Sequence, residues 1–125
     1  MAQALSRLVR KILREARTQG RRPFPCKAGR KMVVVSAEGM LYPCEPLWLE
    51  QQGSTPQNTA EFRIADLREF DFDVSRALLS PKARAVGKYI DSERCTCEYG
   101  CAVLNSVLYC PRMYPRLLRE LVGGR

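Results

Sequence analysis

The segment from Cys26 to Cys44 has the sequence CKAGRKMVVVSAEGMLYPC. Three consecutive valines at 33–35 predict a buried strand, Gly39 supplies a turn, and residues 40–42 predict the returning strand. Antiparallel pairing of these strands would bring the two flanking cysteines close together. The segment therefore predicts a β-hairpin that presents two thiols.

Helices are predicted on both sides of this hairpin. Before it, an amphipathic helix carries a stripe of apolar residues and ends near Gly20. The stripe comprises Leu5, Leu8, Val9, Ile12, Leu13 and Ala16. After the hairpin we expect a polar, proline-bearing segment over 45–61 with a loop at 51–57, and then a buried stretch over 62–67. Helices are expected over 73–79, 80–90, 102–109 and 115–122. Together these elements predict an α+β fold, in which a small β-hairpin is followed by short helices.

Positive charge is concentrated at the N-terminal end of this 125-residue chain. Ten of its 21 basic residues precede Met32, opposed there only by Glu15, whereas the rest is almost neutral. No apolar stretch is long enough to be a secretory signal or to span a membrane. We therefore expect a cytoplasmic protein that is not inserted in a membrane.

Six cysteines without any histidine form the second unusual feature. A Ser/His or Cys/His catalytic pair cannot be built from this chain alone. In a reducing compartment, clustered cysteines bind metal more often than they form disulfides. The cysteines are Cys26, Cys44, Cys95, Cys97, Cys101 and Cys110.

Spacing distinguishes these thiols from one another. Cys95 and Cys97 would share one side of an extended segment, and the four-residue step to Cys101 would place Cys97 and Cys101 on one helical face. The close spacing predicts metal ligands, together with Cys26 and Cys44, whereas Cys110 on an apolar segment is interpreted as a buried core residue. An all-sulfur site suits zinc or an iron–sulfur cluster, and the wide separation of Cys26 and Cys44 favours iron–sulfur.

These motifs resemble the SPASM and twitch domains at the C-terminus of radical SAM enzymes. The similarity rests on Cys26-x12-Gly39-x4-Cys44, on residues 64–70, and on Cys97-x3-Cys101, and it covers roughly residues 23–119. It implies a basic helix and linker over 1–22 and a cluster domain over 23–122. It also implies that Cys26, Cys44 and Cys101 are cluster ligands, with Cys97 or Cys95 as the fourth.

Two departures limit what the resemblance implies. Two thiolate-ligated cubanes would need more cysteines than the six present, so one [4Fe–4S] cluster is expected. The Cys-x3-Cys-x2-Cys loop that supports S-adenosylmethionine cleavage does not occur in the sequence. The chain is therefore expected to be non-catalytic alone and to work with a radical SAM catalytic domain in the same or a neighbouring chain.

The expected role is electron transfer or substrate positioning by an auxiliary cluster. The alternative is a zinc-binding module whose basic N-terminal segment contacts nucleic acid. Poor zinc-knuckle spacing and the lack of base-stacking aromatic residues near that segment make nucleic acid the less favoured partner. A third possibility, a disulfide-stapled domain, would need an oxidising compartment.

Overall fold

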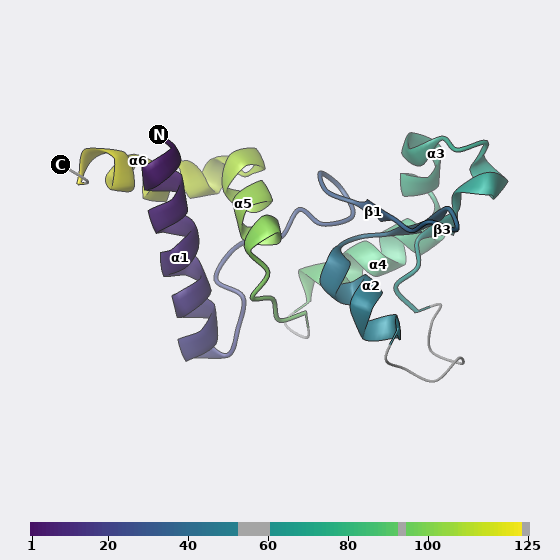
Figure 1. Ribbon diagram of the computed structural model, residues 1–125, viewed down its shortest axis with the longest axis horizontal. Coiled ribbons are helices and arrows are strands. Elements are labelled where there is room, and N and C mark those ends of the chain that lie inside the picture. The colour runs from purple at the N-terminus through teal and green to yellow at the C-terminus, as the bar shows by residue number, and fades with distance from the viewer. Residues whose placement is uncertain (53–60, 93–94, 124–125) are drawn as a thin grey trace. The chain divides into compact units, whose positions relative to one another are not determined.

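A computed structural model describes residues 1–52, 61–92 and 95–123 of the chain (Figure 1). The chain divides into two compact units. The helical unit comprises Met1–Lys27 and Asp91–Arg125, and the sheet unit comprises Ala28–Ile90. The domains predicted from the sequence, 1–22 and 23–122, do not coincide with these units, because the N-terminal helix packs with the C-terminal helices.

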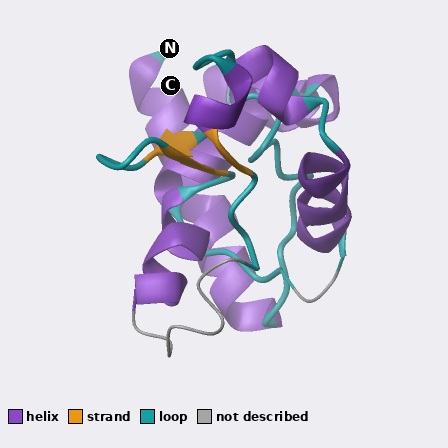
Figure 2. Cartoon of the chain, turned by 90° about the vertical axis from the view of Figure 1, so that its right-hand side faces the viewer, coloured by secondary structure: helices purple, strands orange, loops and turns teal. Residues whose placement is uncertain are grey.

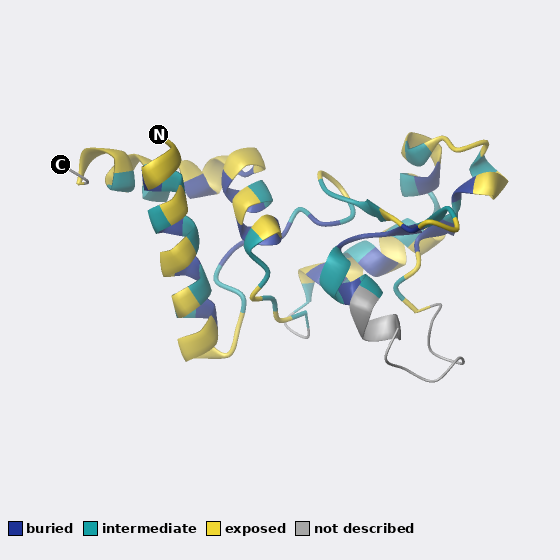
Figure 3. Cartoon of the chain, viewed as in Figure 1, coloured by how far each residue is buried: buried dark blue, intermediate teal, exposed yellow. Residues whose placement is uncertain are grey.

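Helix α1 (Ala2–Gln19) is the predicted amphipathic helix, and it ends at Gly20 as expected. One face of the helix is buried, at Ala4, Leu8, Ile12 and Ala16, as the dark blue bands on α1 show (Figure 3). Arg10, Arg14 and Arg17 are exposed, whereas Arg7 is half-buried. This buried face packs against α5 (Gly100–Tyr109) and α6 (Tyr114–Val122). Burial of this stripe, rather than helix propensity alone, stabilises α1 within the helical unit.

The last two helices are separated where the sequence predicts a break. Helix α5 ends at Cys110, and Pro111 begins the short 3-10 helix η2 (Pro111–Met113), which leads into α6. Proline cannot continue a helix because it lacks the N–H donor, but it is tolerated in a first turn. The predicted helices over 102–109 and 115–122 are thus confirmed.

The sheet unit contains a small antiparallel sheet, coloured orange in Figure 2. Its strands β1 (Val34–Val35), β2 (Met40–Tyr42) and β3 (Ala65–Asp66) lie in the order β1-β2-β3, with Val34 opposite Tyr42 and Leu41 opposite Ala65. The predicted hairpin is confirmed. The prediction that its first strand is buried is wrong, because β1 lies at the sheet edge and Val35 is 49% exposed.

Short helices follow the sheet. Asp66 caps η1 (Leu67–Phe70), Asp73 caps α3 (Val74–Leu78), and the Ser80 hydroxyl accepts a hydrogen bond from Ala83 N–H at the start of α4 (Pro81–Asp91). These elements match the predictions. Helix α2 (Glu45–Gln52) was not predicted, so the loop predicted over 51–57 is wrong at residues 51 and 52. Residues 53–60 lie outside the described residues. Mixed helix and antiparallel sheet confirm the α+β class.

Gly29 connects the start of the sheet unit to the end of the hairpin through backbone hydrogen bonds. Its N–H donates to the carbonyls of Met32 (2.8 Å) and Pro43 (3.1 Å), and its φ of 72° lies in the left-handed region. A Cβ at this position would lie 3.3 Å from the Pro43 Cβ. A side chain is therefore disfavoured both by the backbone conformation and by the tight contact with Pro43.

We expect Gly29→Ala to lower the free energy of unfolding by about 2–3 kcal/mol, since left-handed strain and a steric clash add together. The matched control is Gly39→Ala at the hairpin turn. Its φ of 82° imposes similar strain, but the nearest atom to the added Cβ is a Phe72 ring carbon at an ordinary 3.9 Å. Urea titrations of both variants measure the difference. Equal losses in the two proteins would show that the Pro43 contact is easily relieved.

Candidate metal centre

The cysteines are distributed over both units. Cys26, Cys95, Cys97, Cys101 and Cys110 belong to the helical unit. Cys44 belongs to the sheet unit, where it is 7% exposed and its carbonyl accepts the Trp48 N–H at the start of α2. The prediction that the hairpin brings Cys26 and Cys44 together stays a prediction, because the two residues fall in different units.

Residues 95–99 lead into α5 and belong to no helix or strand. Cys95 and Cys97 are half-buried, whereas Thr96 and Glu98 between and after them are exposed. This alternation is what an extended backbone imposes on successive side chains. The alternation agrees with the expectation from the sequence, but that the two thiols share one side stays a prediction.

Cys97 does not lie on α5. The helix begins at Gly100, and the Cys97 sulfur accepts a hydrogen bond of 3.4 Å from the N–H of Tyr99, the residue at the N-cap position. The prediction that Cys97 and Cys101 share a helical face is therefore wrong. The four-residue spacing instead spans a turn, in which a backbone N–H is aimed at the first sulfur, an arrangement that favours negative charge on that sulfur.

Cys26 and Cys97 are neighbours within the helical unit. Burial raises the pKa of the Cys97 thiol, and the nearby thiol of Cys26 raises that pKa further. The Tyr99 N–H and the positive charge of Arg22 act in the opposite direction. Two cysteines 71 positions apart in the sequence thus lie close enough to interact electrostatically within the helical unit.

Arg22 is a residue of this region that sequence reasoning did not single out. Its Nε donates to the Phe24 carbonyl at 3.1 Å, and its guanidinium lies 5.9 Å from the centre of the Phe24 ring. Arg22 and Cys95 also line one cavity of about 290 Å³, together with Gly20, Arg21, Asp91 and Ser92. The two nearby prolines predicted only an extended linker here, so no local signal marked the arginine.

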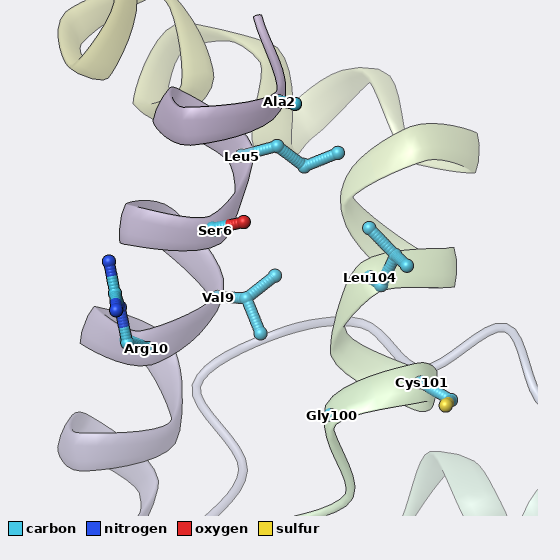
Figure 4. A pocket seen from close by; sticks show the side chains of 8 residues that line it. All are labelled: Ala2, Leu5, Ser6, Val9, Arg10, Gly100, Cys101 and Leu104. Atoms are coloured by element: carbon cyan, nitrogen blue, oxygen red, sulfur yellow. The ribbon is translucent and has the colours of Figure 1, made fainter.

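Cys101 lies in the first turn of α5, and its side chain is exposed. It borders a cavity of about 430 Å³ between α1 and α5, whose walls include Leu5, Val9 and Leu104 (Figure 4). In Figure 4 the leucines and the valine point into this groove, whereas the sulfur of Cys101 points away from α1. The thiol is accordingly accessible to a ligand from outside the helical unit.

Cys110 differs from the other cysteines. It caps the C-terminal end of α5 and is 4% exposed, and its carbonyl accepts the Met113 N–H at 2.9 Å. The thiols of Cys97, Cys101 and Cys110 form no disulfide bond. Burial at a helix junction agrees with the interpretation of Cys110 as a core residue.

The described residues do not assemble a complete metal cage. Over 1–52, 61–92 and 95–123, no three Cys, Asp or Glu side chains are gathered closely enough to hold a metal ion. The helical unit brings together Cys26 and Cys97, and Cys95, two residues before Cys97, is half-buried. It supplies soft sulfur donors, which are the ligand type that zinc and iron–sulfur clusters prefer.

Much of the basic face of α1 is already paired within the helical unit. Lys11 and Arg7 contact the Glu120 carboxylate, at 2.6 Å and 3.8 Å, and Arg17 contacts that of Glu98 at 2.7 Å. These partly exposed ion pairs add little stability, but they leave fewer cations for an anionic partner. They make the basic face less suited to nucleic acid than its sequence suggests.

No protein-family model, curated protein or solved structure matches this chain. None of the helices in the described residues combines the length and the apolar character needed to cross a membrane.

Proposed function

We propose that this protein is an iron–sulfur cluster-binding domain that holds one [4Fe–4S] cluster through four cysteine thiolates. The observation that carries the proposal is the approach of Cys26 and Cys97, from distant parts of the sequence, within the helical unit. Cys44 and Cys101 complete the ligand set. The chemistry of these donors fits the group, because iron–sulfur clusters are held by thiolates from scattered positions.

Cys97 is the better fourth ligand, and Cys95 is the alternative. The Tyr99 N–H that is directed at the Cys97 sulfur would stabilise a thiolate there, and hydrogen bonds to sulfur are a usual feature of cluster sites. Cys95 lies two residues before Cys97 and is also half-buried. It would then be a neighbour of the cluster, or a ligand in exchange with Cys97.

The hairpin supports a role for Cys44. The hydrogen bond from Gly29 N–H to the Pro43 carbonyl ties the chain shortly after Cys26 to the residue directly before Cys44. Three residues of chain, spanning at most about 11 Å when extended, connect Cys26 to Gly29. This short tether favours a ligand set that draws on both cysteines.

An auxiliary cluster of this kind would serve in one-electron transfer or in substrate positioning. The protein's residues contribute the thiolates, hydrogen bonds to sulfur and protection from solvent. A radical SAM catalytic domain, in this or a neighbouring chain, would be the partner that cleaves S-adenosylmethionine, and the cytoplasm would be the compartment. The domain would not perform that cleavage itself.

The test is metal and acid-labile sulfide analysis of the full chain, purified without oxygen. We expect a brown protein with about four iron and four sulfide per chain, since one cubane has this composition. A colourless protein with one zinc and no sulfide would contradict the proposal. It would favour the zinc-binding module, whose binding to nucleic acid should then weaken steeply with added salt.

A further inference from the structure

Helix α6 turns its polar side toward α1. The Glu120 carboxylate contacts Arg7 and Lys11 of α1. The Arg116 guanidinium contacts the Glu15 carboxylate, which also belongs to α1. None of the described residues of α6 is buried. This is the reverse of the usual arrangement, in which the apolar stripe of an amphipathic helix faces the core and its charges face water.

The apolar side of α6 is exposed to solvent, and Figure 3 shows this helix mostly in yellow. Its apolar face, defined by residues that recur at helical spacing, comprises Tyr114, Leu118, Leu121 and Val122. Leu118 lies two positions from both Arg116 and Glu120, and therefore on nearly the opposite side of the helix. Leu118 is 59% exposed and Val122 is 78% exposed. The apolar face thus points away from α1.

This apolar surface continues onto α5. The Tyr114 hydroxyl, at the start of α6, donates a hydrogen bond of 3.0 Å to the Leu108 carbonyl. The Leu108 side chain is itself exposed. Large apolar side chains that are scattered singly over a surface need no explanation, but a contiguous group of them marks an interaction site.

Positive charge accompanies the apolar face. The helical unit has 13 basic and five acidic residues, whereas the sheet unit has eight of each. Arg112, just before α6, and Arg119, which follows Leu118, are exposed. The acidic residues nearest to them on α6 and α1, Glu120 and Glu15, already have basic partners. A second copy of the chain would bring like charges together, whereas an anionic surface would complement them.

The form of this face fits a lipid surface. Neither of the two cavities described above is lined by α6, so the face offers protruding side chains rather than a groove. A fluid bilayer accepts such side chains without matching their shape, and interfacial helices combine an apolar face, aromatic rings and basic residues. The nine residues of α6 span about 14 Å, which is less than half of a hydrocarbon core of about 30 Å.

We propose that α6 docks the helical unit on the surface of an anionic lipid bilayer. The helix lies in the plane of the interface and does not cross it. Leu118 and Val122 enter the boundary between head groups and acyl chains, and Arg112 and Arg119 contact anionic head groups. The inference is independent of the proposed function, because it needs no metal.

The experiment is co-sedimentation of the full chain with vesicles, at an ionic strength of about 0.15 M. One set contains phosphatidylserine and phosphatidylcholine in equal parts, and the other contains phosphatidylcholine alone. We expect the wild type to bind the anionic vesicles at least about tenfold more tightly, because each basic residue near the surface adds attraction. Leu118→Gln should weaken this binding about tenfold, since less apolar surface leaves water. Arg119→Gln should weaken it about fivefold.

The matched control is Leu79→Gln, which makes the same change at a leucine of the sheet unit that is 74% exposed. It should bind as the wild type does. Both leucines are exposed, so both variants should keep their fold, which circular dichroism checks. Equal losses in the two variants, or no preference of the wild type for anionic vesicles, would overturn the inference. A dimer in sedimentation equilibrium that Leu118→Gln abolishes, without vesicle binding, would also overturn it and assign the face to a second copy.

Discussion

A Cys44→Ser protein is expected to lose most of its iron and sulfide, falling from about four of each per chain to less than one. Serine cannot replace a thiolate as a soft ligand, and a cubane deprived of one of four thiolates is readily lost. Because cluster binding and folding are coupled, the variant should also unfold at a lower temperature than the loaded wild type. Iron and sulfide analysis of protein purified without oxygen measures the first effect, and thermal denaturation followed by circular dichroism measures the second.

Cys110→Ser is the matched control for this experiment. Cys44 and Cys110 are both buried, at 7% and 4% exposure, so each substitution introduces a hydroxyl in a buried place. We expect Cys110→Ser to keep its full cluster, since Cys110 caps α5 and has no counterpart in the ligand motif. Equal loss of iron from the two variants would show that the assignment of the ligands is wrong.

Ile12→Ala should lower the free energy of unfolding of the helical unit by about 2–5 kcal/mol. Ile12 is 0% exposed on the face of α1 that packs against α5 and α6, and truncation there removes apolar contacts and leaves a cavity. The same packing aligns the segment that contains Cys26 with the segment that contains Cys97. We therefore also expect a lower iron content in this variant, measured beside its urea denaturation curve.

Arg10→Ala tests whether this loss comes from packing. Arg10 is exposed on the same helix, and exposed helical positions accept alanine at a cost within about 0.5 kcal/mol. A similar loss of stability in Arg10→Ala and Ile12→Ala would mean that α1 contributes little through its buried stripe.

Local signals in the sequence were sufficient to predict most of the helices and the hairpin. The stripe on α1, the turn at Gly39 and the cap at Ser80 each act over a few residues, so they could be identified without knowledge of the fold. Helix α2 was missed because its segment is polar and contains Pro46, which is nevertheless tolerated in a first turn. The edge position of β1 was missed because three valines indicate a strand but not its neighbours.

The arrangement of the candidate site was less predictable. The spacing of the cysteines identified the thiols, but it could not show that α5 begins only at Gly100 and leaves Cys97 outside the helix. Arg22 gave no signal, because its importance depends on segments that meet in space. The pairing of Arg17 with Glu98 spans 81 positions, and periodicity shows which face of a helix is apolar without showing what covers it.

The helical unit is built from two segments that are far apart in the sequence, and this determines when a cluster could be inserted. During synthesis α1 emerges well before the helices that bury its apolar face, because Arg7 and its partner Glu120 are 113 positions apart. All residues of the sheet unit have been synthesised before α6 can pack against α1, so the two units would fold in a fixed order. A nascent chain that has reached residue 94 contains only Cys26 and Cys44 among its thiols. Cluster assembly on four thiolates would therefore have to wait until α5 has left the ribosome.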